Sequence, residues 1–257
     1  MSAGPPPEPP PDPDARRDAL AEALAAVRER IATAARDAGR DPDGIALLAV
    51  TKTWPATDVA HLVDLGLREF GENKEQEGAA KAAELADLRP TAAPRWHVVG
   101  RLQRNKARSL VRWAHAVDSV DSQRLVDALE SAAGKALGAG ERDAPLAVLL
   151  QVSLDGDPSR GGVVADEVPA LADRVAQSEH LHLDGVMTVA PQGVAPAEAF
   201  STFASIAERV RAAHPTATTV SAGMSGDLED AIAHGSTCVR VGTALLGGRP
   251  LAFRVSE

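Results

Sequence analysis

The chain has 257 residues, of which 44% are hydrophobic and 25% charged, and this balance predicts one large domain with a real core. The net charge of −9 argues against a nucleic-acid surface, because phosphate backbones are bound by clustered lysine and arginine. The single cysteine, Cys238, excludes an internal disulfide and no apolar run approaches a membrane span, so we expect a cytoplasmic protein that binds a small molecule.

The N-terminal segment is unusually rich in proline. Residues 1–13 hold seven of the 18 prolines, with few backbone donors and few apolar side chains. Such a composition cannot form a packed core. We therefore expect a disordered tail over residues 1–14, a barrel domain over 15–250 and a short C-terminal tail over 251–257.

Helical periodicity begins directly after this tail. Leu20, Leu24, Val27 and Ile31 are spaced four, three and four residues apart, and Gly39 stands where a helix can end. The pattern predicts an additional N-terminal helix, which we expect to pack on the outside of the domain.

From Ile45 onward, short β-rich apolar runs alternate with stretches of helical spacing. The predicted strands cover residues 45–51, 67–71, 95–100, 115–120, 146–153, 181–189, 218–223 and 237–242. The predicted helices between them cover residues 57–65, 74–86, 103–112, 122–137, 167–178, 197–213 and 227–234. Eight such units predict an α/β fold that closes into a single (β/α)8 TIM barrel. A doubly wound open sheet is the competing architecture, but no Gly-x-Gly-x-x-Gly turn follows the first strand.

Lys52 directly follows the first predicted strand. Ligands of such barrels bind at the C-terminal ends of the strands, where an amine at the mouth of an apolar cavity can attack an aldehyde. The alternative is a solvated lysine at a strand end, and this residue alone favours that alternative.

The seventh and eighth strands both run into small and hydroxyl residues. Ser225 can donate its hydroxyl, while Gly223 and Gly226 let backbone amides approach an anion, and Gly242 with Thr243 repeats the arrangement. The loops after strands seven and eight are the usual phosphate site of such barrels. Ser225 could also be only a helix N-cap.

Arg240 shares strand parity with Gly242, so its side chain is expected on the side of this anion site. It could pair with the phosphate, pair with an internal carboxylate, or donate to the ring nitrogen of a bound pyridine.

Six motifs in order along the chain resemble the YggS/PROSC family of pyridoxal phosphate (PLP) homeostasis proteins. They are LLAVTKTWP around Lys52, FGENKEQEG at 70–78, RWHVVGRLQRNK at 95–106, GVMTVAP at 185–191, SAGMSGDLEDAI at 221–232 and GSTCVRVGTALLGGR at 235–249. The resemblance extends from about residue 20 to 250.

The resemblance implies that the protein binds PLP and that Lys52 carries it as a Schiff base. It also implies further contacts, which are Ser225, Gly242 and Thr243 for the phosphate, Arg240 for the pyridine nitrogen, and Asn73, His97 and Met224 near the cofactor. The chain departs from the family in the loop after strand five, where Arg160 stands in place of the usual lysine and cannot form an imine. The C-terminus lacks the lysine pair that some relatives carry.

The barrel also resembles the N-terminal domain of alanine racemase, so a PLP-dependent racemase or decarboxylase is the alternative function. Those racemases use a tyrosine base and an additional domain, whereas this chain has no tyrosine. His97 or Cys238 could supply protons, although a structural histidine and an inert buried thiol are the default interpretations. An arginine at the pyridine nitrogen leaves the ring a poor electron sink. We therefore expect a monomeric carrier in intracellular PLP homeostasis that supplies PLP-dependent apo-enzymes, without robust catalysis of its own; a Schiff-base aldolase is a distant third.

Overall fold

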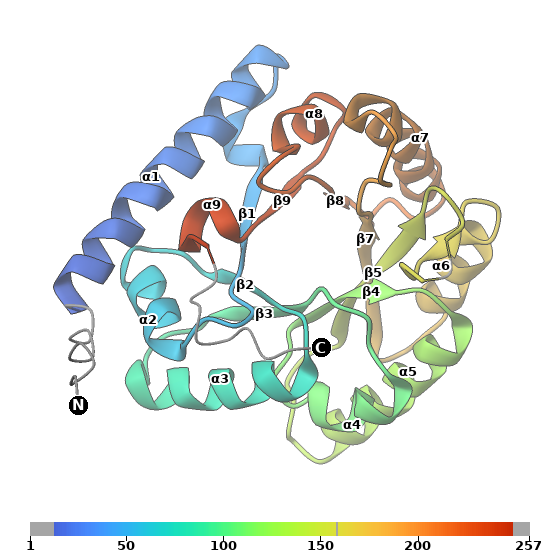
Figure 1. Ribbon diagram of the computed structural model, residues 1–257. Coiled ribbons are helices and arrows are strands. Elements are labelled where there is room, and N and C mark those ends of the chain that lie inside the picture. The colour runs from blue at the N-terminus through green and yellow to red at the C-terminus, as the bar shows by residue number, and fades with distance from the viewer. Residues whose placement is uncertain (1–12, 158, 249–257) are drawn as a thin grey trace, which may run out of the picture.

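The computed structural model describes residues 13–157 and 159–248, and its strands form a closed parallel barrel (Figure 1). The strand order is β4-β3-β2-β1-β9-β8-β7-β5, and β5 pairs with β4 to close the ring. The barrel strands are β1 (Ala46–Val50), β2 (Glu69–Glu72), β3 (Arg95–Val98), β4 (Ala116–Val120), β5 (Leu146–Ser153), β7 (Leu181–Met187), β8 (Thr219–Ser221) and β9 (Cys238–Val241). The eight predicted strands and the TIM barrel are confirmed.

Helices surround this ring, as Figure 1 shows. They are α2 (Ala56–Asp64), α3 (Glu75–Leu88), α4 (Ala107–Leu110), α5 (Gln123–Gly138), α6 (Val168–Ala176), α7 (Pro196–Ala213) and α8 (Leu228–Ala233). The predicted helix over 103–112 is divided into a 3-10 turn, η2 (Arg104–Lys106), and α4. Three further elements were not predicted, namely η1 (Pro42–Gly44), the two-residue strand β6 (Val163–Val164), which pairs only with β5, and the one-turn helix α9 (Thr243–Leu246). Within the described ranges, no helix is both long enough and apolar enough to cross a bilayer.

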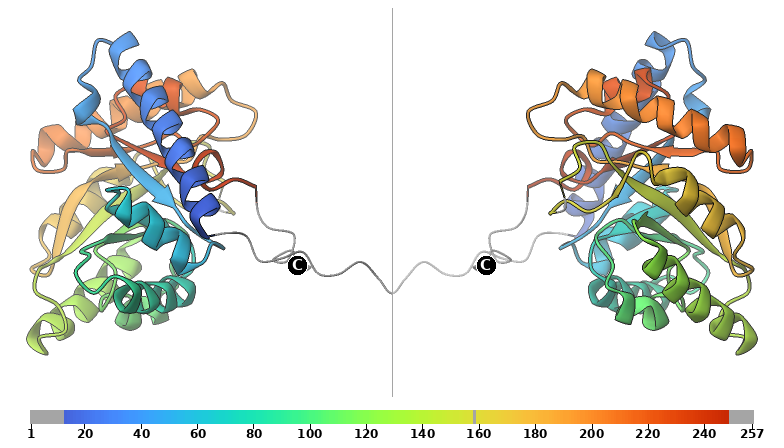
Figure 2. Two further views of the ribbon diagram at one scale, coloured as in Figure 1. Left: turned by 90° about the vertical axis from the view of Figure 1, so that its left-hand side faces the viewer. Right: turned by 90° about the vertical axis from the view of Figure 1, so that its right-hand side faces the viewer.

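The additional N-terminal helix is α1 (Pro13–Asp37), which lies obliquely across the outside of the barrel (Figure 2). It packs against α2, α8 and α9. Its predicted apolar stripe, which consists of Leu20, Leu24, Val27 and Ile31, is buried. Gly39 follows the helix with φ of +65°, a backbone conformation that favours glycine at a helix end. The helix begins at Pro13, two residues inside the predicted tail of residues 1–14; the rest of that tail and the predicted C-terminal tail lie outside the described residues.

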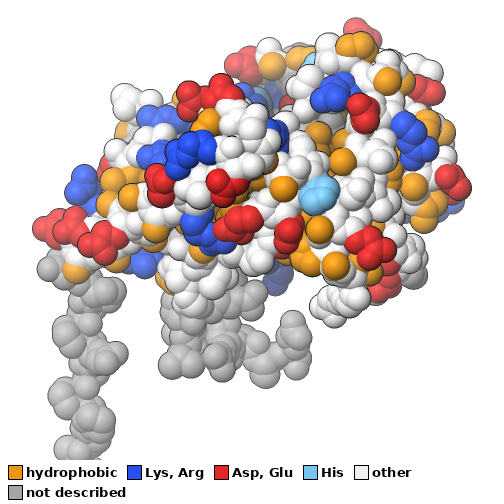
Figure 3. All heavy atoms as spheres, turned by 90° about the horizontal axis from the view of Figure 1, so that it is seen from above, with side chains coloured by type: hydrophobic (Ala, Val, Ile, Leu, Met, Phe, Trp, Pro, Cys, Tyr) orange, Lys and Arg blue, Asp and Glu red, His pale blue; other side chains and the backbone are white. Residues whose placement is uncertain are grey.

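The apolar core consists of two clusters, each of which lies between a part of the strand ring and the helices that cover it. One cluster joins β4, β5 and β7 to α5, α6 and α7, and the other joins α1, α2 and β1 to α8 and β9. On the face drawn in Figure 3, acidic and basic side chains are interspersed over the surface. The two clusters cover the outer faces of the strands with helices, as is usual for parallel strands in a barrel.

Candidate functional site

A cavity of about 500 Å³ opens at the C-terminal ends of the strands, where the first and last strands of the barrel meet. All the predicted cofactor residues line it except His97; they are Lys52, Asn73, Met224, Ser225, Arg240, Gly242 and Thr243. Its volume lies in the range of small-molecule pockets. The structure therefore brings together residues that are up to 191 positions apart, from Lys52 to Thr243.

Lys52 follows the end of β1, and the residue before it, Thr51, is fixed by hydrogen bonds to two buried side chains. Thr51 is fully buried, its hydroxyl donates to Glu72 Oε1 at 2.6 Å, and its carbonyl accepts from Lys81 Nζ at 2.7 Å. Lys81 Nζ also lies 2.5 Å from Glu72 Oε1. Burial raises the pKa of Glu72, against the lowering effect of Lys81 and Thr51.

The residue after Lys52, Thr53, is bound by Glu77 of α3, the helix that also carries Lys81. Thr53 donates its backbone N–H to Glu77 Oε1, and its φ of +68° makes it the only non-glycine residue with positive φ in the described ranges. Such a conformation is costly for a β-branched residue and persists only where its surroundings fix it. Glu77 and Lys81 are one turn apart on α3, so this one helix fixes the backbone on both sides of Lys52.

The other end of the cavity is suited to an anion. Ser225 Oγ accepts from the backbone N–H of Ala244 at 3.3 Å, which joins the loop after β8 to the first turn of α9. Gly223 has φ of +90°, and a Cβ there would lie 2.6 Å from the side chain of Ala231. At Gly242 a Cβ would lie 3.2 Å from the carbonyl oxygen of Val50. Position 223 therefore needs glycine, whereas a Cβ at Gly242 would be a tight contact, and the small residues leave backbone amides and hydroxyls open to an anion such as a phosphate.

Arg240 lies in the barrel interior and is 5% exposed. It donates to Ser221 Oγ at 2.7 Å and to the carbonyl of Thr188 at 2.6 Å. Burial lowers the pKa of its guanidinium. These two bonds fix the guanidinium plane toward the cavity that Arg240 lines, and sequence reasoning did not identify Ser221 or Thr188 as its partners.

His97 does not line the cavity in the described part of the chain. Its ring lies within the barrel, where Nδ1 is 2.9 Å from Asp118 Oδ1 and Nε2 is 2.8 Å from Glu69 Oε2. Burial acts to lower the pKa of His97, but the two carboxylates outweigh it and raise the pKa to about 10. The imidazole is therefore a charged structural bridge between β2, β3 and β4.

Cys238 is buried beside this polar core. Burial raises the pKa of its thiol to about 12, and Asp118 acts in the same direction. A thiol with this pKa is a poor acid, base or nucleophile near neutral pH. The inert role expected for Cys238 agrees with this environment.

Arg160 also lines the cavity, and its guanidinium is engaged by the protein. It donates to the carbonyls of Ala190 at 2.7 Å and Val189 at 3.2 Å, and it forms an ion pair with Asp155 at 2.9 Å. Arg160 thus fastens the loop after β5 to the loop after β7 at the rim of the cavity.

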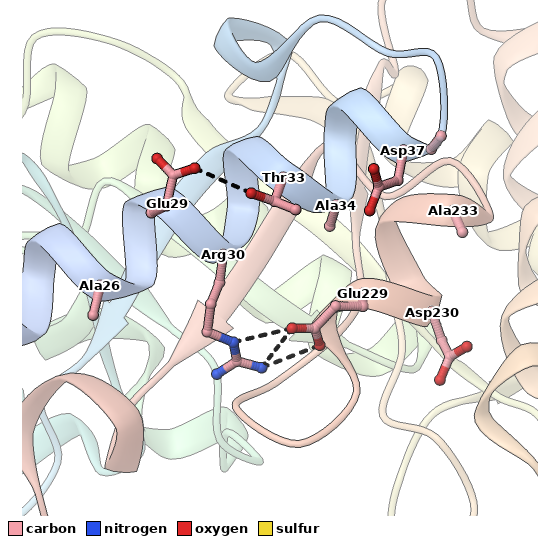
Figure 4. A pocket seen from close by; sticks show the side chains of 10 residues that line it. Ala26, Glu29, Arg30, Thr33, Ala34, Asp37, Glu229, Asp230 and Ala233 are labelled. Carbon is pink, nitrogen blue, oxygen red and sulfur yellow. Dashed lines mark hydrogen bonds and ion pairs between the residues drawn. The ribbon is translucent and has the colours of Figure 1, made fainter.

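The loop that carries Ser225 is also held from outside the barrel. Arg30 of α1 donates to the carbonyl of Ser225 at 3.2 Å and forms a bidentate ion pair with Glu229 of α8 at 2.8 Å (Figure 4). Arg30 and Glu229 line a separate groove of about 610 Å³ between α1 and α8. The N-terminal helix is therefore connected to the anion end of the cavity by one side chain.

Comparison with protein families places almost the whole chain in one of them. Residues 23–250 match the family model described as alanine racemase, N-terminal domain. The chain is 53% identical over 236 residues to a pyridoxal phosphate homeostasis protein of Mycobacterium tuberculosis, covering 88% of this chain and 91% of that one. It is 38% identical over 229 residues to the protein of the same name in Escherichia coli K12, covering 87% of this chain and 94% of that one.

Solved structures share the fold. PipY of Synechococcus elongatus with PLP bound superposes with a TM-score of 0.72 at 35% identity, covering 89% of this chain and all of that one. Alanine racemase of Corynebacterium glutamicum superposes with a TM-score of 0.63 at 18% identity, and the match covers 93% of this chain but 63% of the racemase. The second likeness concerns the fold alone.

Proposed function

The chain belongs to the alanine racemase N-terminal domain family and, within it, to the pyridoxal phosphate homeostasis proteins, and on this premise we propose that it binds and carries PLP. The single observation that supports this most directly is that Lys52 lines the same cavity of about 500 Å³ as the proposed phosphate-binding residues, which are Ser225, Gly242 and Thr243. A phosphorylated aldehyde needs an amine at one end of its site and phosphate donors at the other.

Each predicted cofactor residue that lines the cavity has a role in the proposal. Lys52 holds the cofactor aldehyde as a Schiff base, while Ser225, Gly242 and Thr243 hold the phosphate. Arg240 faces the pyridine nitrogen as a donor, with its guanidinium fixed by Ser221 and Thr188. Asn73 and Met224 form walls of the same cavity.

When bound, PLP supplies an electron sink for amino-acid chemistry, and we propose that this protein withholds that chemistry. A permanently charged donor at the pyridine nitrogen disfavours protonation of the ring. No tyrosine is present in the sequence, His97 is fixed between two carboxylates, and the thiol of Cys238 has a pKa of about 12. The curated relatives at 53% and 38% identity are named pyridoxal phosphate homeostasis proteins, which supports a carrier over a racemase.

We further propose that the protein acts as a monomer in the cytoplasm and gives PLP to apo-enzymes that depend on it. The test compares the rate at which an apo-enzyme regains activity with the loaded protein or with an equal concentration of free PLP, each in the presence of a phosphatase that destroys free PLP. Reactivation that persists only with the loaded protein supports direct delivery. Equal loss of reactivation in both samples would overturn it.

A further inference from the structure

A second hollow, of about 1000 Å³, opens beside the cofactor cavity, between the segment after β3 and the start of α5. Three arginines line it, Arg101, Arg104 and Arg124. We name it the arginine hollow. Arg101 also lines the cofactor cavity, so the two spaces share a wall.

The three guanidinium groups have no protein acceptor in the described structure. Some other surface arginines of this acidic chain are engaged, as Arg89 is with Asp64 at 2.6 Å and Arg174 with Asp127 at 2.6 Å. The three arginines of the hollow are exposed, and within the described ranges their guanidinium groups form neither an ion pair nor a side-chain hydrogen bond. Three uncompensated guanidinium groups around one hollow make a local positive potential in a protein of net charge −9.

The start of α5 adds backbone donors to the same hollow. Ser122 is the N-cap of this 16-residue helix, its side chain makes no capping hydrogen bond, and the first turn contains no acidic residue. An N-terminus with these features carries a partial positive charge and open N–H groups. Gln103 and Asn105 provide side-chain amides, and Asp121 is the one carboxylate among the residues of the lining.

We propose that the arginine hollow is a second anion site, for a multiply charged phosphate or pyrophosphate group, and that it is distinct from the proposed phosphate-binding residues of the cofactor cavity. Arginine forks match the oxygens of such groups in paired hydrogen bonds, and the helix N-terminus completes the donor set. A ligand held there would lie against the wall that the cofactor cavity shares. The inference goes beyond PLP binding and uses none of the residues that would hold PLP.

The experiment first occupies the cofactor site, by loading with PLP and reducing with borohydride, so that the cofactor cavity is not available to a second anion. Inorganic pyrophosphate and ADP are then titrated into this protein by calorimetry at low salt; the first probe represents a free anion and the second a phosphate ester. The variant R101Q/R104Q/R124Q is compared with R28Q/R209Q/R211Q, which removes three exposed arginines of α1 and α7 that likewise lack ion pairs and so changes the net charge equally.

We expect one pyrophosphate or ADP per protein, with affinity falling by about tenfold or more in the hollow variant and unchanged in the control, since the hollow variant loses charge-assisted hydrogen bonds to the anion. Tighter binding of ADP than of pyrophosphate would identify an ester as the ligand class, and the reverse a free anion. No binding of either probe, or equal weakening in both variants, would overturn the proposal. Failure to form the reduced adduct would refute the proposed PLP binding but not the second anion site. The same two variants can then be compared with the two probes without the reduction step.

Discussion

The backbone around Lys52 is fixed by residues that do not touch the cavity. Lys81 and Glu72 form a buried ion pair, 5% and 0% exposed, and both bind Thr51. Neither residue was singled out from the sequence, because the pair joins Glu72 at the end of β2 to Lys81 on α3, and a contact between two elements is not visible in the sequence of either one. The pair explains how a strand end can hold an amine at a fixed place, since it binds the residue directly before Lys52.

Lys81→Met tests this support. Removing the ammonium leaves Glu72 buried without a counter-charge, so we expect a loss of about 3–5 kcal/mol of stability in urea unfolding. The double variant Lys81→Met/Glu72→Leu should recover most of that stability, because it removes the unpaired charge, while its PLP affinity stays below that of the wild type. Lys135→Met, on the surface of α5, serves as the control. Wild-type PLP affinity in the stable double variant would contradict a positioning role.

His97 makes stability depend on pH in the alkaline range. Its pKa is raised to about 10 in the folded protein, from about 6.5 in an unfolded chain. Between these values the folded state keeps a proton that the unfolded state releases. The contribution of His97 to the free energy of unfolding is therefore fully present below about pH 6.5 and is lost as the pH rises toward 10. Urea unfolding of wild type and of His214→Gln should both show this decline, and His97→Gln should show less of it. An NMR titration that found the His97 imidazole deprotonating near pH 6.5 would contradict the assignment.

The sequence motifs predicted most of the residues that line the cavity, but they did not predict the position of His97 inside the barrel. The motifs placed Lys52, Ser225, Arg240, Gly242 and Thr243 at strand ends, and strand ends are where the cavity lies. His97 is different because its depth in the barrel depends on the register between β2, β3 and β4, where it pairs with Gly71 and Ala116. Strand register across a barrel is a tertiary property that a single strand does not encode.

At the scale of elements, α1 contacts the loop that carries Ser225 as well as covering the outside of the barrel. The helix packs on α2, α8 and α9, and its Arg30 donates to the carbonyl of Ser225. Arg30 also forms the ion pair with Glu229 that Figure 4 shows. The helix was predicted from its apolar spacing alone. Its contact with the Ser225 loop was not, because that contact joins residues 195 positions apart.

Arg30→Met should weaken the hold on the cofactor phosphate. A half-exposed ion pair contributes about 1 kcal/mol or less, so we expect a modest effect on stability and an increase in the Kd for PLP of about threefold to tenfold, since the Ser225 loop loses its anchor. Arg36→Met is the matched control, because Arg36 pairs with Glu29 on the same helix and touches no loop of the cavity. An equal Kd in wild type and Arg30→Met, measured by fluorescence titration, would show that α1 does not position this loop.

The short elements were the ones that the sequence did not predict. Helix α9 has four residues and β6 has two, lengths at which neither apolar periodicity nor propensity gives a signal. Helix α9 nevertheless supplies Thr243 and Ala244 to the anion end of the cavity. Strands such as β1 and β5, by contrast, are largely apolar runs that can be recognised locally, whereas β2, with the sequence EFGE, is recognised only by its place in the alternation of strands and helices.

At the scale of the whole molecule, one closed barrel carries the complete cavity. Residues from β1, from the loop after β8 and from α9 meet at its C-terminal face, as expected for this fold. The catalytic additions of a racemase have no counterpart among the residues that line the cavity, which include no cysteine, histidine or tyrosine.

The most direct test of this account is the visible spectrum of the purified protein with PLP, beside Lys52→Ala, followed by borohydride reduction and peptide mass mapping. We predict a visible band in the wild type that Lys52→Ala lacks, and a reduced PLP adduct on the peptide that contains Lys52. A band of equal strength in both proteins, or an adduct on another lysine, would contradict the assignment of Lys52, and the absence of any band would refute PLP binding itself.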